Sequence, residues 1–231
     1  MPQSDAVGGR SRGCRGSEIA ESDGLAVAPA ERSCYFSGVS KGEETRRQVL
    51  EAAVEVAASG GLASLTIGSL AERTGMSKSG LFAHFKSKEA LQVQVLEFAS
   101  EAFVEDVVRP ALCAPRGEKR ITTLFESWLA VSRDGTAECL FVSAAWEYDD
   151  QPGPVRDRLV RMHLDFNDAV AQMFRTGIAE GFFAAGADPE QFTHDLHGIM
   201  LIYFQAHRLL GDARAEARAR NAFSRLIESN R

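Results

Sequence analysis

The sequence predicts an all-α protein: a three-helix DNA-binding head with a helix-turn-helix, followed by a helical-bundle C-terminal domain, with about nine helices in all. Three observations support this fold class. From Lys41 onward, apolar residues recur at the spacing of a helix face. Glycine and proline interrupt this pattern at intervals of about 15–30 residues, as helix ends do. No run alternates apolar and polar residues in the way a half-buried strand would.

The composition is that of an ordinary globular chain. Of its 231 residues, 45% are hydrophobic and 25% are charged. No stretch reaches the roughly 20 apolar residues of a membrane span. The first 30 residues hold no continuous apolar segment like that of an export signal. We therefore expect a cytoplasmic protein with no membrane partner.

Residues 1–40 differ in kind from the rest of the chain. They are rich in Gly, Ser, Ala and Arg and show no helical or strand period. Such a composition buries too little apolar surface to offset the chain entropy lost on folding. We expect a disordered N-terminal tail over 1–40, a helix-turn-helix DNA-binding domain over 41–88, and a C-terminal ligand-binding and dimerisation domain over 89–231.

No set of residues points to an enzyme. The four cysteines form no CxxC pair, so free thiols are expected rather than a zinc site. The sequence contains no P-loop, no G-x-S-x-G and no dinucleotide fingerprint. His194 and His197 lie one helical turn apart, but an exposed or interface pair explains them better than a metal does. We expect no catalytic residue, no cofactor and no metal.

Capping residues divide the first hundred positions into four helices. The first ends at Gly60-Gly61. Thr66 opens a short second helix, and Gly75 closes it. Ser77 caps a third short helix. Ser87 caps a long fourth helix, which we expect to end at Pro110 and Pro115. Further helices are expected at about 121–129, 137–148, 155–178, 188–210 and 213–229.

The segment Thr66–Leu91, which reads TIGSLAERTGMSKSGLFAHFKSKEAL, is the most informative part of the chain. A short helix is followed by a tight turn at 75–77 and then by a second short helix, as in a helix-turn-helix. The second helix of such a motif enters the major groove with its N-terminal residues. Lys78 can donate to guanine, and the serines beside it can bond to any base edge.

The same segment resembles the N-terminal domain of the TetR family of transcriptional regulators over about 43–92. The matching pieces are Thr66, Leu70-Ala71, Gly75-Met76-Ser77, His84-Phe85, Ser87-Lys88-Glu89 and Leu91. Beyond this segment the likeness rests on the number and length of the helices.

The resemblance implies roles for individual residues. Ser77, Lys78, Ser79 and Gly80 occupy the stretch that reads bases. The positions that it assigns to phosphate contacts are Thr45, Thr66, His84 and Lys88. Taken singly, the lysines also fit a solvated surface, and His84 fits simple packing.

One position departs from the family pattern. Phe82 stands where the family usually has a tyrosine, so a hydroxyl that reaches the DNA backbone is missing. That contact is weakened by about 1 kcal/mol. We expect the rings of both Phe82 and Phe85 to pack in the core.

In the family, the last two helices of each subunit form a four-helix bundle with those of a second copy. The interface residues that this implies are Phe192, Leu196, Ile199, Tyr203, Phe223 and Leu226. The helix at 188–210 is apolar over much of its circumference, which fits burial against a partner. The alternative is that this helix packs in the internal core.

Aromatic residues and methionines are concentrated between 89 and 180. The resemblance implies a pocket there for a small effector, and an apolar lining suits a hydrophobic one. Our candidates are Phe98, Trp128, Phe141, Met162 and Phe166. His163 and Asp165 are the residues that could add polarity. Core packing is the alternative for each.

The net charge of −6, taken for the whole chain, disfavours nucleic-acid binding. However, residues 41–100 hold seven basic and seven acidic residues, whereas 101–231 hold 15 and 20. The field at the contacting face matters more than the total. We therefore expect a homodimeric, ligand-responsive repressor on a palindromic double-stranded DNA operator, with a small hydrophobic effector. The alternative is a helical ligand-sensing dimer that acts through protein partners.

Overall fold

The computed structural model describes residues 41–134 and 137–231. In these two ranges every regular element is helical, and none is a strand, which confirms the predicted all-α fold. Because α4, η2 and α5 follow one another without a break, the ten α-helices of the described residues make nine continuous helices. The predicted tail, 1–40, lies outside the described residues. Within them, no helix has both the length and the apolar character needed to cross a membrane.

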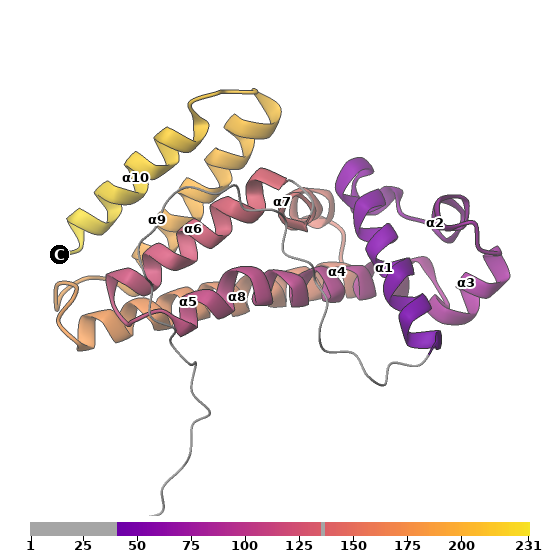
Figure 1. Ribbon diagram of the computed structural model, residues 1–231, viewed down its shortest axis with the longest axis horizontal. Helices are drawn as coiled ribbons and strands as arrows, with labels where there is room; N and C mark the ends of the chain where they lie inside the picture. The colour runs from indigo at the N-terminus through magenta and orange to yellow at the C-terminus, as the bar shows by residue number, and fades with distance from the viewer. Residues whose placement is uncertain (1–40, 135–136) are drawn as a thin grey trace, which may run out of the picture. The chain divides into compact units, whose positions relative to one another are not determined.

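The head begins with α1 (Lys41–Gly60), the 3-10 turn η1 (Leu62–Ser64), α2 (Ile67–Thr74) and α3 (Lys78–Phe85), on the right of Figure 1. The predicted caps are confirmed. Thr66 and Ser69 form a capping box, in which the Thr66 hydroxyl accepts the Ser69 amide at 3.0 Å. Gly75 ends α2 in the left-handed conformation, with φ at 68°.

The helix that follows runs further than the sequence predicted. Ser87 caps α4 (Lys88–Phe103), but the chain continues through the π-helical η2 (Val104–Val108) into α5 (Arg109–Cys113). The prediction that Pro110 ends the helix is therefore wrong. Proline lacks an amide and crowds the carbonyl four residues before it, and the wider π turn accommodates both effects. Pro115 does end the helix, because Ala114 before it is extended.

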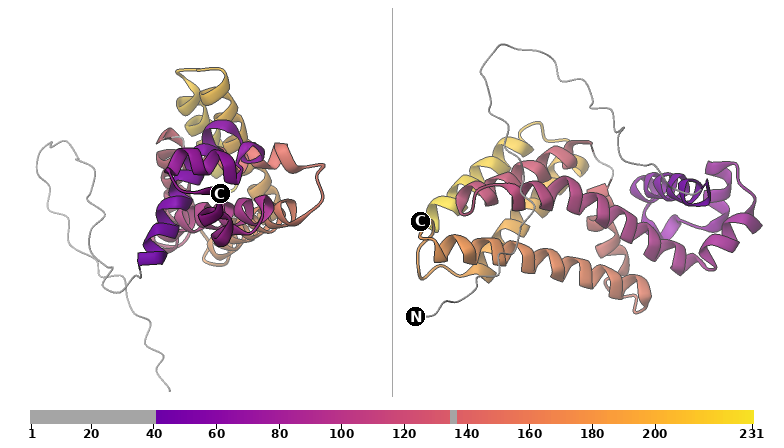
Figure 2. Two further views of the ribbon diagram at one scale, coloured as in Figure 1. Left: turned by 90° about the vertical axis from the view of Figure 1, so that its right-hand side faces the viewer. Right: turned by 60° about the horizontal axis from the view of Figure 1, so that its bottom comes forward.

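The C-terminal half consists of α6 (Glu118–Asp134), α7 (Ala137–Tyr148), α8 (Pro154–Ala179), α9 (Pro189–Phe204), the π-helical η3 (Gln205–Leu209) and α10 (Ala215–Ser229). Figures 1 and 2 show α4 running beside α8, and α9 forming a pair with α10. Asp188 caps α9, accepting from the amides of Glu190 and Gln191. The cavity described below lies among these helices.

Two clusters of buried apolar residues hold the helices together. The first includes Phe85 of α3, Leu91 of α4 and Leu140 of α7, so the head shares its core with later helices. The second includes Phe174 of α8, whose ring stacks on Phe192 of α9 at 4.0 Å between centroids. Because the first cluster crosses position 88, the proposed boundary between 41–88 and 89–231 stays a prediction.

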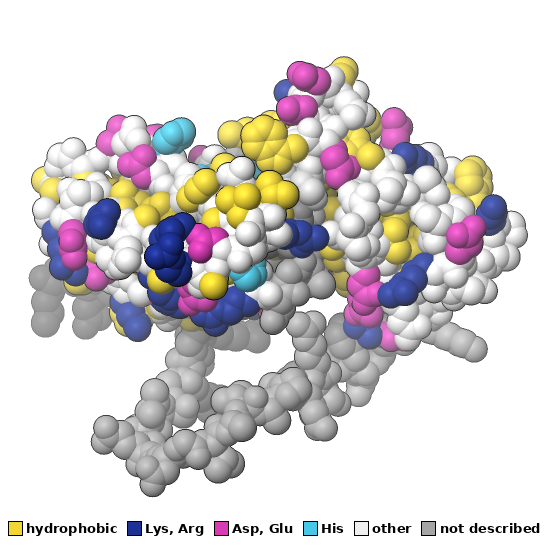
Figure 3. All heavy atoms as spheres, turned by 90° about the horizontal axis from the view of Figure 1, so that it is seen from above, with side chains coloured by type: hydrophobic (Ala, Val, Ile, Leu, Met, Phe, Trp, Pro, Cys, Tyr) yellow, Lys and Arg dark blue, Asp and Glu magenta, His cyan; other side chains and the backbone are white. Residues whose placement is uncertain are grey.

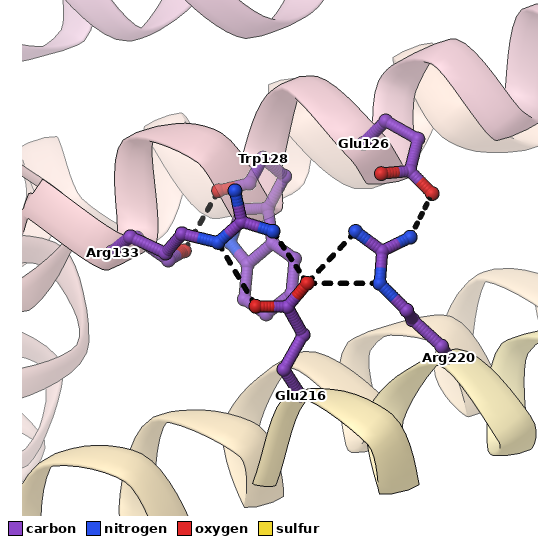
Figure 4. A network of polar contacts seen from close by, with 6 residues as sticks. Glu126, Trp128, Arg133, Glu216 and Arg220 are labelled. Atoms are coloured by element: carbon purple, nitrogen blue, oxygen red, sulfur yellow. Dashed lines mark hydrogen bonds and ion pairs between the residues drawn. The ribbon is translucent and has the colours of Figure 1, made fainter. Parts of the chain in front are cut away.

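A polar network joins α6 to α10 at the surface, as Figure 4 shows. The Glu216 carboxylate accepts from Nε of Arg133 and from Nε of Arg220, each at 2.9 Å, and Arg220 also pairs with Glu126. The hydrogen bonds from Arg133 and then Arg220 lower the pKa of Glu216 to about 2. Because these groups are partly exposed, solvent limits what the network contributes to stability.

Candidate functional site

The second helix of the helix-turn-helix presents its N-terminal residues to solvent. The Ser77 hydroxyl caps α3 by accepting from the Gly80 amide at 3.1 Å, and it lies 3.3 Å from the hydroxyl of Ser79. Leu81 and Phe85 are fully buried and fix α3 against the core. The side chains of Lys78 and Ser79 are therefore left exposed at its start.

The structure brings some of the other predicted DNA contacts together. The side chain of Lys78 extends to the start of α2. Its amine and the Thr66 hydroxyl both lie within 4 Å of the position that a Cβ atom on Gly68 would occupy. His84 is exposed on α3, and Thr45 is half-buried on α1. The exposed Lys88 donates to the Ala63 carbonyl at 2.6 Å. The Thr66 hydroxyl also accepts the Ser69 amide in the capping box. Lys88 and Thr66 therefore each have a hydrogen-bond partner within the protein.

Phe82 lies where the sequence analysis did not expect it. We expected its ring to pack in the core, but 58% of the residue is exposed, so this prediction is wrong. Leu81 and Phe85 are four residues apart and share the inward face of α3, and Phe82 is turned about 100° away from Leu81. Its ring therefore stands on the outer surface of the helix-turn-helix.

Three lysines on or just after α3 have no acidic partner in the part of the chain that the structure describes, although Arg73 at the end of α2 pairs with Glu55. Arg47 pairs with Glu44 and Glu51 on α1, whereas Lys78, Lys86 and Lys88 form no ion pair there. Lys86 ends α3 with φ at 63°, and is the one non-glycine residue with positive φ among those described. Nothing in the spacing of nearby residues predicts this conformation. The positive charges of the three lysines are not neutralised by ion pairs within the described residues, although the net charge of the whole chain is negative.

An apolar cavity of about 90 Å³ lies among α4, α6, α7, α8 and α9. Nine of its lining residues are apolar and three are polar. The lining consists of Ser100, Phe103, Trp128, Phe141, Val142, Met162, His163, Phe166, His197, Met200, Leu201 and Phe204. Trp128, Phe141, Met162 and Phe166 were predicted as pocket residues. Phe98, the fifth, packs instead against the cluster that includes the head.

Sequence reasoning missed the part of the cavity wall that comes from α9. His197, Met200, Leu201 and Phe204 line it, although the sequence analysis assigned this helix to a dimer interface. The His197 ring meets the Phe166 ring edge-on at 5.6 Å. His163 lines the cavity as one of the two polar candidates, whereas Asp165 is exposed and takes no part.

The residues predicted for the dimer interface are covered by the chain itself. Phe192, Leu196, Tyr203, Phe223 and Leu226 are all less than 9% exposed in the second core cluster, and Ile199 packs against it. Their burial within one chain is what the alternative of internal core packing describes, and their place in a dimer interface stays a prediction.

A different apolar surface is open on the C-terminal half. Figure 3 shows hydrophobic side chains gathered near the middle of one face of the molecule. The exposed apolar residues of α9 and of the turn after it are Leu201, Ile202, Leu209 and Leu210, which we call the α9 face. Beside it runs a groove of about 990 Å³, which Trp146 of α7 and Arg208 also line.

The turn η1, just before the helix-turn-helix, is held by residues from α7 and α4, and the nearby end of α1 is held by a residue from η3. Glu147 of α7 accepts the amides of Leu62 and Ala63, at 3.2 and 2.7 Å. The buried Gln92 of α4 donates to the Leu62 carbonyl at 2.7 Å. From η3, Arg208 donates to the carbonyl of Ala58, near the end of α1, at 3.0 Å. Helices that line the cavity therefore also contact the head.

Two family models match separate parts of the chain. The model described as "Bacterial regulatory proteins, tetR family" matches residues 49–95. The model described as "Tetracyclin repressor-like, C-terminal domain" matches residues 117–223. No curated protein sequence matches the chain.

Solved structures share the fold. A TetR-family regulator from Cytophaga hutchinsonii aligns with a TM-score of 0.73 at 16% identity, covering 84% of this chain and 98% of its own. One from Chloroflexus aurantiacus aligns at 0.72 and 23% identity, covering 81% and 94%. AibR, solved with isovaleryl coenzyme A and operator DNA, aligns at 0.62 and 20% identity, covering 76% and 94%. With models of both the N-terminal and the C-terminal domain matched, the chain belongs to the TetR family of transcriptional regulators.

Proposed function

We propose that the protein is a ligand-responsive repressor that binds a palindromic operator as a homodimer. The observation that carries this proposal is the start of α3, where Lys78 and Ser79 are exposed on a helix-turn-helix. Lys86 and Lys88 lie nearby, and neither forms an ion pair with the described acidic residues. An exposed recognition helix with a positive local field is what major-groove binding requires.

Base reading falls to Ser77, Lys78, Ser79 and Gly80 in this proposal. The small size of Ser77, Ser79 and Gly80 lets the helix approach the base edges, and Lys78 supplies the donor for guanine. Thr45, Thr66, His84 and Lys88 contact phosphates, together with the edge of the exposed Phe82. Phosphate contacts fix the register of the protein on DNA but carry little sequence information.

A second copy docks on the α9 face. Two recognition helices are needed to reach successive major grooves, about 34 Å apart. Ile202 and Leu209 are 58% and 74% exposed, so burying them against a partner removes apolar surface from water. Gly198, on the same helix, has no neighbour within 4 Å of the place a Cβ would occupy, so another helix can approach closely there.

The structural change that an effector causes in the cavity is transmitted to the head through α7 and α9. Phe141 and Val142 of α7 line the cavity, and Glu147 on the same helix holds η1. Phe204 lines it too, and the Arg208 guanidinium lies 5.9 Å from its ring. To turn a 99:1 preference for the DNA-binding form into 1:99, the effector must prefer the other form by about 10⁴-fold, or about 5.5 kcal/mol.

The AibR structure holds isovaleryl coenzyme A and operator DNA together, which supports a protein that binds both an effector and DNA. An operator on the chromosome places this function in the cytoplasm. The exposed apolar ring of Phe82 is the observation that favours the other candidate, a ligand sensor acting through protein partners, since apolar surface suits a protein contact.

A gel-shift experiment with DNA from upstream of the protein's own gene separates the two candidates. We expect the full chain to shift this DNA, and Lys78→Glu to abolish the shift. Lys119→Glu, an exposed lysine at the start of α6, is the matched control and keeps it. Failure of the full chain to shift any upstream fragment, or equal shifts by both variants, contradicts the proposed function.

A further inference from the structure

One residue that lines the cavity, His163, has a buried hydrogen-bond acceptor that no described group satisfies. Nε2 of His163 is buried and has no hydrogen-bond partner. The same imidazole hydrogen-bonds to the backbone of Phe141 on α7. Since Nε2 has no partner, Nδ1 makes that bond. Because the bond favours the protonated ring, the imidazole is its donor and the carbonyl its acceptor.

The ring is therefore a neutral imidazole with its proton on Nδ1. Burial lowers the pKa of His163. The ring of His197 lies 6.1 Å away, and burial together with His163 lowers its pKa as well. In a neutral imidazole with Nδ1 protonated, Nε2 keeps a lone pair and can only accept.

The rest of the cavity wall limits what can satisfy that lone pair. None of the described lining residues is Asp, Glu, Lys or Arg, so a charged ligand would lose its hydration without a counter-charge. Most of the wall is aromatic or aliphatic. The volume of about 90 Å³ is below the roughly 150 Å³ of a cavity known to hold benzene. The enclosed part of a ligand is therefore small, neutral and apolar.

We infer that the effector is a small, neutral, apolar compound with a hydroxyl group, whose O–H donates to Nε2 of His163. This rests on the proposed function, in which the cavity is the effector site. A larger effector can extend into the neighbouring groove, because Val142, Leu201 and Phe204 line both spaces. A ketone of the same size offers no donor, so its oxygen would face the lone pair of Nε2.

The test compares cyclopentanol, cyclopentanone and cyclopentanecarboxylate as probes. The full chain carrying Trp146→Phe is used, since this leaves Trp128, on the cavity wall, as the one tryptophan whose fluorescence reports binding. We expect the alcohol to bind about tenfold more tightly than the ketone, which corresponds to about 1.4 kcal/mol. The carboxylate is expected to bind more weakly than either.

Variants of His163 assign the preference to its ring. His163→Leu is expected to bring alcohol and ketone within about twofold of each other, whereas His163→Gln, which keeps an acceptor, retains a preference for the alcohol. His194→Leu, an exposed histidine on α9, is the control and keeps the tenfold ratio. Circular dichroism of each variant establishes that it is folded.

Any one of three results overturns the inference. The ketone or the carboxylate could bind as tightly as the alcohol, the ratio of alcohol to ketone affinity could be unchanged in His163→Leu, or none of the probes could bind. The gel shift without ligand is a separate measurement. If DNA is bound but the alcohol is not preferred, this inference fails and the proposed function stands. If DNA is not bound, the proposed function fails whatever the cavity binds.

Discussion

The Glu147 carboxylate accepts a hydrogen bond from the Ala63 amide at 2.7 Å, across 84 positions of the sequence. Ala63 lies in η1, three residues before the capping box that opens the helix-turn-helix. Six residues before Glu147, on the same helix α7, Phe141 lines the apolar cavity. In the proposed function, a displacement of α7 by an effector would therefore be passed on to the segment that precedes α2 and α3.

Replacing Glu147 by glutamine tests this connection. The amide side chain keeps one acceptor but loses the charge that strengthens the bonds to Leu62 and Ala63. We expect the free energy of unfolding, measured with urea, to fall by about 1–2 kcal/mol. Operator affinity should fall as well. Asp149→Asn is the control. Within the described residues, that exposed carboxylate accepts a hydrogen bond only from the backbone amide of the next residue, Asp150. Equal effects of the two substitutions would contradict a specific role for Glu147.

Lys78 and Lys88 are expected to differ in what they contribute to DNA binding. Lys78→Ala should change the preferred base in its half-site, at a cost of about 1–3 kcal/mol on the best sequence. Lys88→Ala should weaken binding to specific and random DNA alike and reduce the salt dependence by about one counterion. Fluorescence anisotropy over a range of salt concentrations measures both. If Lys78→Ala lowered affinity for specific and random DNA equally, its role in base reading would be wrong.

Phe82→Tyr should strengthen operator binding. The ring is exposed on the outer surface of α3, so an added hydroxyl meets water in the free protein and can reach the DNA backbone in the complex. One further hydrogen bond is worth about 0.5–1.5 kcal/mol, or roughly twofold to tenfold in affinity. The melting temperature should stay nearly constant. A loss of affinity would show that the phenyl edge itself packs against the DNA.

Stability should decline as the pH falls below 6.5. Burial lowers the pKa of His163 and His197 in the folded chain, so below 6.5 the unfolded chain takes up protons that the folded chain does not. Above 6.5 both states are neutral, and these residues contribute no pH dependence. Each histidine can account for up to about 1.4 kcal/mol per pH unit until the lowered pKa is reached.

Urea unfolding at pH 7.5, 6.5 and 5.5 measures this decline. His163→Gln is expected to make the decline smaller because one of the two buried imidazoles is gone. His84→Gln leaves it unchanged, since that exposed side chain on α3 does not contribute to the lowered pKa of either buried histidine. An identical decline in His163→Gln and the unaltered chain would show that His163 is not held neutral by burial.

The oligomeric state tests the α9 face. Ile202→Asp places a charge among exposed apolar residues. In sedimentation-velocity experiments we expect this variant to be monomeric and the unaltered chain to be dimeric. Leu112→Asp alters another exposed leucine, on α5, and should leave the dimer intact. A dimer that persists in Ile202→Asp would place the interface elsewhere.

The caps and turns of the head could be predicted because they depend on local bonds. Thr66, Ser77 and Ser87 each accept a backbone amide three residues further on, and Gly75 takes a left-handed conformation that its neighbours avoid. Such contacts depend only on the identity and spacing of a few neighbouring residues. The boundaries of the helix-turn-helix therefore follow from the sequence alone, whereas the exposure of Phe82 on α3 does not.

The inward face of α9 could not be predicted in the same way. Apolar residues lie on several sides of this helix, and whether a side faces the core, the cavity or a partner depends on α8 and α10. Phe192 and Leu196 face the core, Phe204 faces the cavity, and Ile202 faces solvent. The bond from Glu147 to Ala63 was equally hidden, since nothing local relates residues so far apart.

In vitro selection from random double-stranded DNA with the full chain tests the central claim most directly. The account predicts enrichment of an inverted repeat whose half-sites are centred about 10 base pairs, or a multiple of that, apart. Lys78→Ala should enrich a repeat altered at one position in each half-site. Recovery of no shared sequence, at salt concentrations where non-specific binding is suppressed, would contradict the claim that this protein is an operator-binding regulator.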